Sequence, residues 1–168
     1  NLGLKQHILW CGDLTQEYGS IILLEDDLFV APGFYRYATA LLGRYAEDSR
    51  IAGISLYTNQ VNHPARLPFV PLPDGNDVYF HQYGASWGQA WTAGQWGAFR
   101  DWYQRSADAA DQQCMSDHLP AYVAGWDAGK SWLKFFNLYL VMCERWVVYP
   151  RVSYSTNYGD AGENCAAR

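Results

Sequence analysis

The chain has 168 residues, of which 49% are apolar and 17% charged, and its net charge is −5. This composition is typical of one globular domain with a sizeable core, so we expect a single domain over residues 1–168. This acidic balance gives no electrostatic footprint for binding to nucleic acid or to an anionic membrane, and no nucleic-acid partner is expected. The longest apolar stretches are too short to span a bilayer as a helix.

Aromatic residues are unusually frequent, at 17% of the chain with 8 tryptophans. Trp and Tyr combine an apolar face with a polar tip, which suits a surface that binds flat or sugar-like ligands. An aromatic-rich core explains the same composition, and composition alone favours the core.

The first half of the chain alternates between helical and strand patterns. Helical spacing predicts a helix over residues 4–18 and an amphipathic helix over residues 34–45. The apolar run 20–24 predicts a central strand of a buried parallel sheet, and residues 51–56 predict a second strand. This order of elements indicates the α/β class with mainly parallel strands in a mixed sheet flanked by helices.

The second half begins with a proline-rich stretch, residues 57–77, which predicts a long loop. A strand is expected over residues 78–83 and a helix over residues 93–106. A further helix is predicted over residues 129–145, followed by a short edge strand at residues 147–150.

Three consecutive carboxylates, Glu25, Asp26 and Asp27, follow the first predicted strand; we call them the acid segment. Ligands of open α/β sheets bind outside the carboxyl ends of strands. Carboxylate oxygens there suit Mg²⁺ or Mn²⁺, with a substrate diphosphate completing the coordination shell. The alternative is that these acids only solvate the strand end and cap the helix that begins near Pro32.

The acid segment and its surroundings resemble the glutamate–aspartate–aspartate segment of GT-A glycosyltransferases. They are most similar to bacterial family 2-like sugar transferases and to the N-acetylglucosaminyltransferase I type. Four stretches carry the resemblance in the right order, namely residues 1–5, 21–35, 86–91 with Trp96, and 149–159. Gln89 departs from the family pattern. The family's first strands are also missing, so we expect this chain to be the C-terminal part of a GT-A catalytic domain.

The resemblance implies a role for each acidic residue. Asp27 corresponds to the family's metal-binding aspartate, Asp26 to a position near the metal, ribose and diphosphate, and Glu25 to a supporting acid at the donor. The resemblance makes Asp127 the expected catalytic base, with Asp101 as the runner-up. By its residue type and position alone, Asp127 also suits an N-cap of the helix that begins near Gly129.

Further residues in the resembling stretches are expected to bind substrate: Tyr83, Ser86, Trp87, Gly88 and Asn157. Tyr83 and Trp87 could stack on a sugar, and a glycine allows the backbone to approach the ligand closely. Packing onto the sheet is the competing explanation, and we favour it for Trp91. The polar tail that starts at Ser153 is interpreted either as a lid over the donor or as a frayed terminus.

The expected function is that of a nucleotide-sugar-dependent glycosyltransferase of bacterial polysaccharide biosynthesis, dependent on Mn²⁺ or Mg²⁺ and inverting. Its partners would be a nucleotide-diphospho-sugar donor and a glycan or lipid-linked acceptor. The resemblance also implies a cytoplasmic location, with peripheral association at the inner membrane face. The alternative is a non-catalytic carbohydrate-binding domain with a degenerate transferase fold. Another phosphate-handling enzyme has less support, because the sequence has no P-loop.

Overall fold

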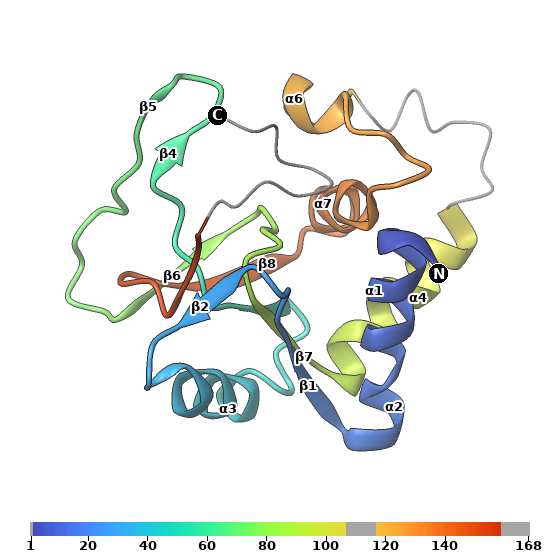
Figure 1. Ribbon diagram of the computed structural model, residues 1–168, viewed down its shortest axis with the longest axis horizontal. Coiled ribbons are helices and arrows are strands. Elements are labelled where there is room, and N and C mark those ends of the chain that lie inside the picture. The colour runs from blue at the N-terminus through green and yellow to red at the C-terminus, as the bar shows by residue number, and fades with distance from the viewer. Residues whose placement is uncertain (1, 107–116, 159–168) are drawn as a thin grey trace.

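A mixed five-stranded sheet with helices on both faces forms the centre of the protein (Figure 1). The structure is a computed structural model and describes residues 2–106 and 117–158. The strands lie in the order β1 (Ser20–Leu23), β7 (Gln89–Thr92), β3 (Ile51–Ser55), β8 (Trp146–Pro150) and β6 (Val78–His81). The α/β class and the mixed, helix-flanked sheet predicted from the sequence are therefore confirmed.

The direction of the strands differs from the expectation of a mainly parallel sheet. Only β3 and β8 are parallel neighbours, whereas β1–β7, β7–β3 and β8–β6 are antiparallel. β1 and β3 do run in the same direction, but β7 lies between them. The alternation of helices and strands therefore predicted the relative direction of β1 and β3 correctly. It did not predict that β7 lies between them, because β7 comes from a glycine-containing stretch that has the pattern of a loop.

The places of two strands in the sheet were also predicted wrongly. β1 has one neighbour and lies at an edge with partly buried side chains, although its apolar run predicted a central strand. β8 was expected at an edge, and it lies between β3 and β6 with four of its five residues buried. An apolar run favours a strand that is buried on both faces, but it does not show how many strands pair with it.

Three helices cover one face of the sheet: α1 (Gly3–Asp13), α4 (Ala93–Ser106) and α7 (Trp132–Met142). Their core is aromatic, and its centre is Trp91 of β7, which is fully buried. The preference for packing at Trp91 is thus confirmed. Gly53 of β3 faces this ring, and a Cβ there would lie 2.6 Å from Trp91 Cδ1.

Helix α3 (Phe34–Arg44) covers the opposite face and packs on β3, β7 and β8 through Ala38 and Leu42. The short helices α2 (Thr15–Tyr18) and α6 (Ala121–Ala124) complete the described helices. Within the described ranges, no helix is both long enough and apolar enough to cross a membrane.

Two small sheets lie outside the central one. β2 (Leu28–Val30) pairs with β9 (Ser155–Asn157), and the two strands run antiparallel. β4 (Val61–Asn62) and β5 (Leu67–Pro68) form a hairpin within the stretch that was predicted to be a loop. The tail from Ser153 to Tyr158 is therefore not frayed, and the rest of that prediction, residues 159–168, lies outside the described residues.

Candidate active site

The sheet topology brings several separate segments to one edge. β1, β3 and β8 all run in the same direction, so their carboxyl ends lie together. The acid segment follows β1, Tyr57 follows β3, and the stretch leading to β9 follows β8. β7 runs the other way, so Trp87, just before it, lies at this edge too.

The acid segment forms the turn between β1 and β2. The Leu28 N–H donates to the Glu25 carbonyl oxygen at 3.3 Å, which closes the turn. Asp26 is exposed, whereas Glu25 and Asp27 are partly buried. None of the salt bridges found between described residues involves these three carboxylates.

The pKa of Glu25 is raised from 4.5 to about 7, first by burial of the carboxyl group and in addition by repulsion from Asp27 and Asp26. Among the described residues, the acid segment thus concentrates negative charge without an ion pair to a basic side chain. A bound cation would relieve this repulsion, which is one reason to consider a metal there.

Strand β9 holds the acid segment from the far end of the chain. Asn157 Nδ2 donates to Asp27 Oδ2 at 3.0 Å, and the Tyr158 N–H donates to the Asp27 carbonyl oxygen at 3.2 Å. The Tyr158 hydroxyl donates to the Asp26 carbonyl oxygen at 2.9 Å, and its ring lies 4.7 Å from that of Phe29. Asn157 therefore contacts the predicted metal-binding aspartate directly.

The stretch Ser86–Gly88 is tied to the same edge. The Ser155 hydroxyl donates to the Trp87 carbonyl oxygen at 2.6 Å, which links this stretch to β9. Gly88 has a φ of 89°, and a Cβ there would lie 3.0 Å from Leu56, so a side chain is disfavoured by both conformation and space. The ring of Trp87 is partly exposed and meets that of Tyr57 edge to face at 4.5 Å.

Tyr83 follows a different strand from the acid segment. It follows β6, which runs antiparallel to β8, and its carbonyl oxygen accepts from the Tyr149 hydroxyl at 2.8 Å. Burial raises the pKa of Tyr83, and the neighbouring Tyr122 and Tyr57 side chains add to this effect. No contact between described residues joins it to the acid segment.

The two candidate bases also make no contact with the acid segment. Asp127 is exposed, and its Oδ1 accepts from the Gly129 N–H at 2.8 Å in the turn before α7. Helix α7 begins at Trp132 instead of near Gly129, and its N-cap is Ser131, whose hydroxyl accepts from the Lys134 N–H at 3.1 Å. Capping of α7 by Asp127 is therefore wrong, because Ser131 fills that position.

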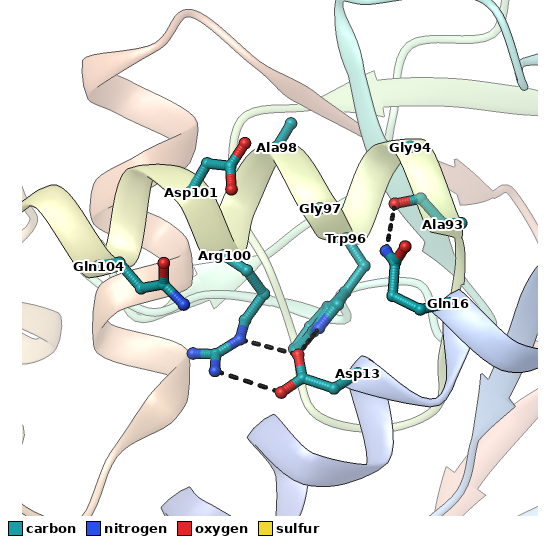
Figure 2. A pocket seen from close by; sticks show the side chains of 10 residues that line it. All are labelled: Asp13, Gln16, Ala93, Gly94, Trp96, Gly97, Ala98, Arg100, Asp101 and Gln104. Carbon is teal, nitrogen blue, oxygen red and sulfur yellow. Dashed lines mark hydrogen bonds and ion pairs between the residues drawn. The ribbon is translucent and has the colours of Figure 1, made fainter.

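Asp101 lies on α4, at a shallow pocket of about 670 Å³ (Figure 2). The polar groups of this pocket join helices: Arg100 Nε and Trp96 Nε1 each donate to Asp13 Oδ1 at 2.8 Å. Gln16 Nε2 donates to the Ala93 carbonyl oxygen at 3.3 Å. The pocket thus lies where α1, α2 and α4 pack together, and its hydrogen bonds connect these helices. Figure 2 shows the Asp101 side chain away from these bonds.

The fit of a metal to the acid segment depends on ligands from the substrate. In the described part of the chain, no three His, Cys, Asp or Glu side chains converge as a metal cluster. Mg²⁺ commonly takes only one or two protein carboxylates and completes its shell with phosphates and water. Two carboxylates of the acid segment fit that limited role. Asp27 bonds to Asn157 through Oδ2, so its Oδ1 is not used in that bond, and Asp26 is exposed.

Sequence reasoning missed two residues of this edge, Tyr57 and Ser155, and it placed Tyr158 only within the tail that was interpreted as a lid or a frayed terminus. Tyr57 could have been found, because it comes directly after a predicted strand, as the acid segment does. Nothing local marks Ser155, and the contacts of both Ser155 and Tyr158 come from the β2–β9 pairing.

The pH dependence of stability provides a test of the buried acid. The native state binds the Glu25 proton more tightly than the unfolded chain does, because its pKa is about 7 instead of 4.5. The contribution of this proton to the stability of the native state is complete below about pH 4.5, and it is lost as the pH rises through about 7. We expect Glu25→Gln to raise the free energy of unfolding by about 1–3 kcal/mol at about pH 8, relative to wild type, and by much less near pH 4.

Urea unfolding at several pH values measures this difference. Glu17→Gln, at an exposed glutamate of α2, is the matched control and should follow the wild-type pH dependence. If Glu25→Gln and wild type showed the same pH dependence of stability, the raised pKa of Glu25 would be contradicted.

Comparison with models of known protein families and with curated proteins gives no match for this chain.

Proposed function

We propose that this chain belongs to the catalytic domain of a glycosyltransferase that takes a nucleotide-diphospho-sugar donor and depends on Mn²⁺ or Mg²⁺. The observation that carries the proposal is the bond from Asn157 to Asp27 at the carboxyl end of β1. It joins two of the stretches in which the sequence resembles GT-A glycosyltransferases. The mixed α/β fold is compatible with that class, and fold alone does not define function.

The acid segment supplies the donor side of the proposed reaction. Asp27 and Asp26 would hold a divalent cation, which as a Lewis acid stabilises the charge on the leaving nucleoside diphosphate. The contacts from Asn157 and Tyr158 hold Asp27 in one orientation. Binding of the cation would therefore cost little conformational entropy at this residue. Glu25 would support this pair from a partly buried position.

The aromatic pair at the same edge would contact sugar. The Trp87 and Tyr57 rings meet edge to face, an arrangement that can leave a ring face available for stacking against the apolar face of a pyranose. Gly88 and Ser86 would position the backbone close to the ligand. The acceptor would be a glycan or a lipid-linked saccharide.

A calorimetric titration with UDP- and GDP-sugars tests the proposal. Binding that requires Mn²⁺ and disappears with EDTA would support a donor site at the acid segment. Binding of free glycans that ignores EDTA would favour the alternative, a non-catalytic carbohydrate-binding domain. Absence of donor binding with Mn²⁺ would overturn the proposal.

The catalytic base can be identified by a pair of substitutions. We expect Asp127→Asn to lower kcat about 10²- to 10⁴-fold, because the acceptor hydroxyl would lose the group that takes its proton. The asparagine keeps an oxygen for the Gly129 N–H, so the turn before α7 should be preserved. Donor affinity should not change.

Asp101→Asn is the matched control, since Asp101 is also an exposed aspartate without contact to the acid segment. Steady-state kinetics with donor and acceptor should show wild-type rates for it. The reverse result, loss of kcat in Asp101→Asn alone, would transfer the role of base to Asp101.

A further inference from the structure

Helix α1 carries two side chains that can bind a metal, next to each other on the face that it turns to solvent. α1 lies at the periphery of the protein (Figure 1). His7 and Cys11 are four positions apart on this helix, so they lie on the same face. Cys11 Sγ is 3.6 Å from His7 Nε2. His7 is exposed and Cys11 is partly exposed, so an ion can reach the pair from solvent.

The distance between these two atoms is the one expected for two ligands of a tetrahedral zinc ion. Zn–S bonds are about 2.3 Å long and Zn–N bonds about 2.0–2.1 Å, so a tetrahedral angle places sulfur and nitrogen about 3.6 Å apart. The His7 ring also packs against Trp10, with ring centroids 6.0 Å apart, and this contact limits its rotation. Thiolate and imidazole are typical ligands of Zn²⁺, whereas the carboxylates of the acid segment suit Mg²⁺ or Mn²⁺.

One copy of the chain provides half of the ligands of a closed zinc site. Structural zinc sites take four protein ligands, and two cysteines with two histidines are a common set. In the described part of the chain, no third His, Cys, Asp or Glu side chain converges on this pair. The carboxylate of α1, Asp13, accepts from Arg100 and Trp96 instead. A second copy related by a twofold axis offers an identical pair and would complete the set.

The solvent-facing side of α1 is suited to contact with a second copy of itself. Two apolar residues border the metal-binding pair, Leu4 at 41% exposure and Trp10 at 55%. The Lys5 ammonium is engaged elsewhere, because its Nζ donates to the Ala128 carbonyl oxygen at 2.8 Å. Two α1 helices can therefore meet without opposing like charges at the contact, although each chain carries a net −5.

The contact between two such helices is too small to be stable without the metal. A stable protein interface buries about 800 Å² on each partner, and one face of an 11-residue helix offers much less. Coordination bonds must therefore supply most of the binding free energy. Association of the two copies should require zinc.

We propose that Zn²⁺ joins two copies of this chain through α1, bound by His7 Nε2 and the Cys11 thiolate of each copy. Each Cys11 thiol releases its proton to solvent as the metal binds. The inference does not rest on the proposed function, because no residue of the acid segment takes part. Donor binding and zinc-dependent dimerisation are therefore tested separately.

Sedimentation velocity under reducing conditions tests the proposal. Wild type should be a monomer in EDTA and a dimer when one Zn²⁺ is added for every two chains. His7→Gln and Cys11→Ser each remove two of the four ligands and should weaken dimerisation at least about a hundredfold. Both positions are at least partly exposed, so circular dichroism should show an unchanged fold. Co²⁺ in place of Zn²⁺ should give the absorption bands of a tetrahedral thiolate complex in wild type and in neither variant.

Cys143→Ser and His63→Gln are the matched controls, because Cys143 is partly exposed, His63 is exposed, and both lie outside α1. They should dimerise with Zn²⁺ as wild type does, and so should Asp27→Asn, which separates this site from the acid segment. The proposal is overturned if wild type stays monomeric with Zn²⁺, binds one Zn²⁺ per monomer, or remains a dimer in EDTA. Dimerisation of His7→Gln or Cys11→Ser at the zinc concentration that suffices for wild type would overturn it as well.

Discussion

Asp27→Asn is expected to weaken Mn²⁺-dependent binding of a nucleotide-sugar by at least about a hundredfold, equal to about 2.7 kcal/mol. The substitution replaces a charged oxygen ligand with a neutral one, and hard divalent cations bind carboxylates much more strongly than amides. The asparagine retains an oxygen that can accept from Asn157 Nδ2, so the link between β2 and β9 should persist. Turnover should fall with donor binding.

Calorimetry with and without EDTA measures this effect. Asn157→Ala isolates the positioning of Asp27: it keeps the carboxylate and removes the group that orients it. We expect a smaller loss, about five- to tenfold, in that variant. Glu17→Gln should bind as wild type does. Normal Mn²⁺ and nucleotide-sugar binding by Asp27→Asn would remove the metal role from this residue.

The largest effect on stability is expected at Trp91. Its side chain is fully buried between β7 and the helices, with ring centroids 4.7 Å from Trp96 and 5.9 Å from Trp132. Trp91→Ala should lower the free energy of unfolding by about 3–5 kcal/mol, because rigid neighbours cannot fill the cavity. Its Nε1 has no hydrogen-bond partner among the described residues, so Trp91→Phe should lower the free energy of unfolding clearly less than Trp91→Ala.

Urea denaturation followed by circular dichroism checks both values. Trp10→Ala makes the same truncation at a tryptophan that is 55% exposed on α1, and should change stability by less than about 0.5 kcal/mol. Similar losses at the two positions would mean that Trp91 is not at the centre of the core.

Local sequence patterns were sufficient for the longer helices. The predicted helix at residues 93–106 coincides with α4, and the one at residues 34–45 is one residue longer than α3. Both depend on apolar spacing within a single segment. The helix expected over residues 129–145 was too long at both ends, because Ser131 is the N-cap of α7 and Glu144, at a φ of 51°, follows its end.

The arrangement of the sheet depended on contacts that no local pattern contains. The stretch before Gln89 has the glycines of a loop, yet β7 fits between β1 and β3 and pairs with both. Strands take their hydrogen bonds from neighbours, so a strand's position is decided by segments far away in the chain.

The sequence by itself determined the α/β class, the main helices and the place of the acid segment directly after a strand, because each is encoded in neighbouring residues. Only the tertiary structure decided which residues surround that segment. Asn157 lies 130 positions after Asp27 and bonds to it because β9 returns to pair with β2. Tyr57 and Trp87 meet there because β3 and β7 run in opposite directions, so the end of one strand lies beside the start of the other.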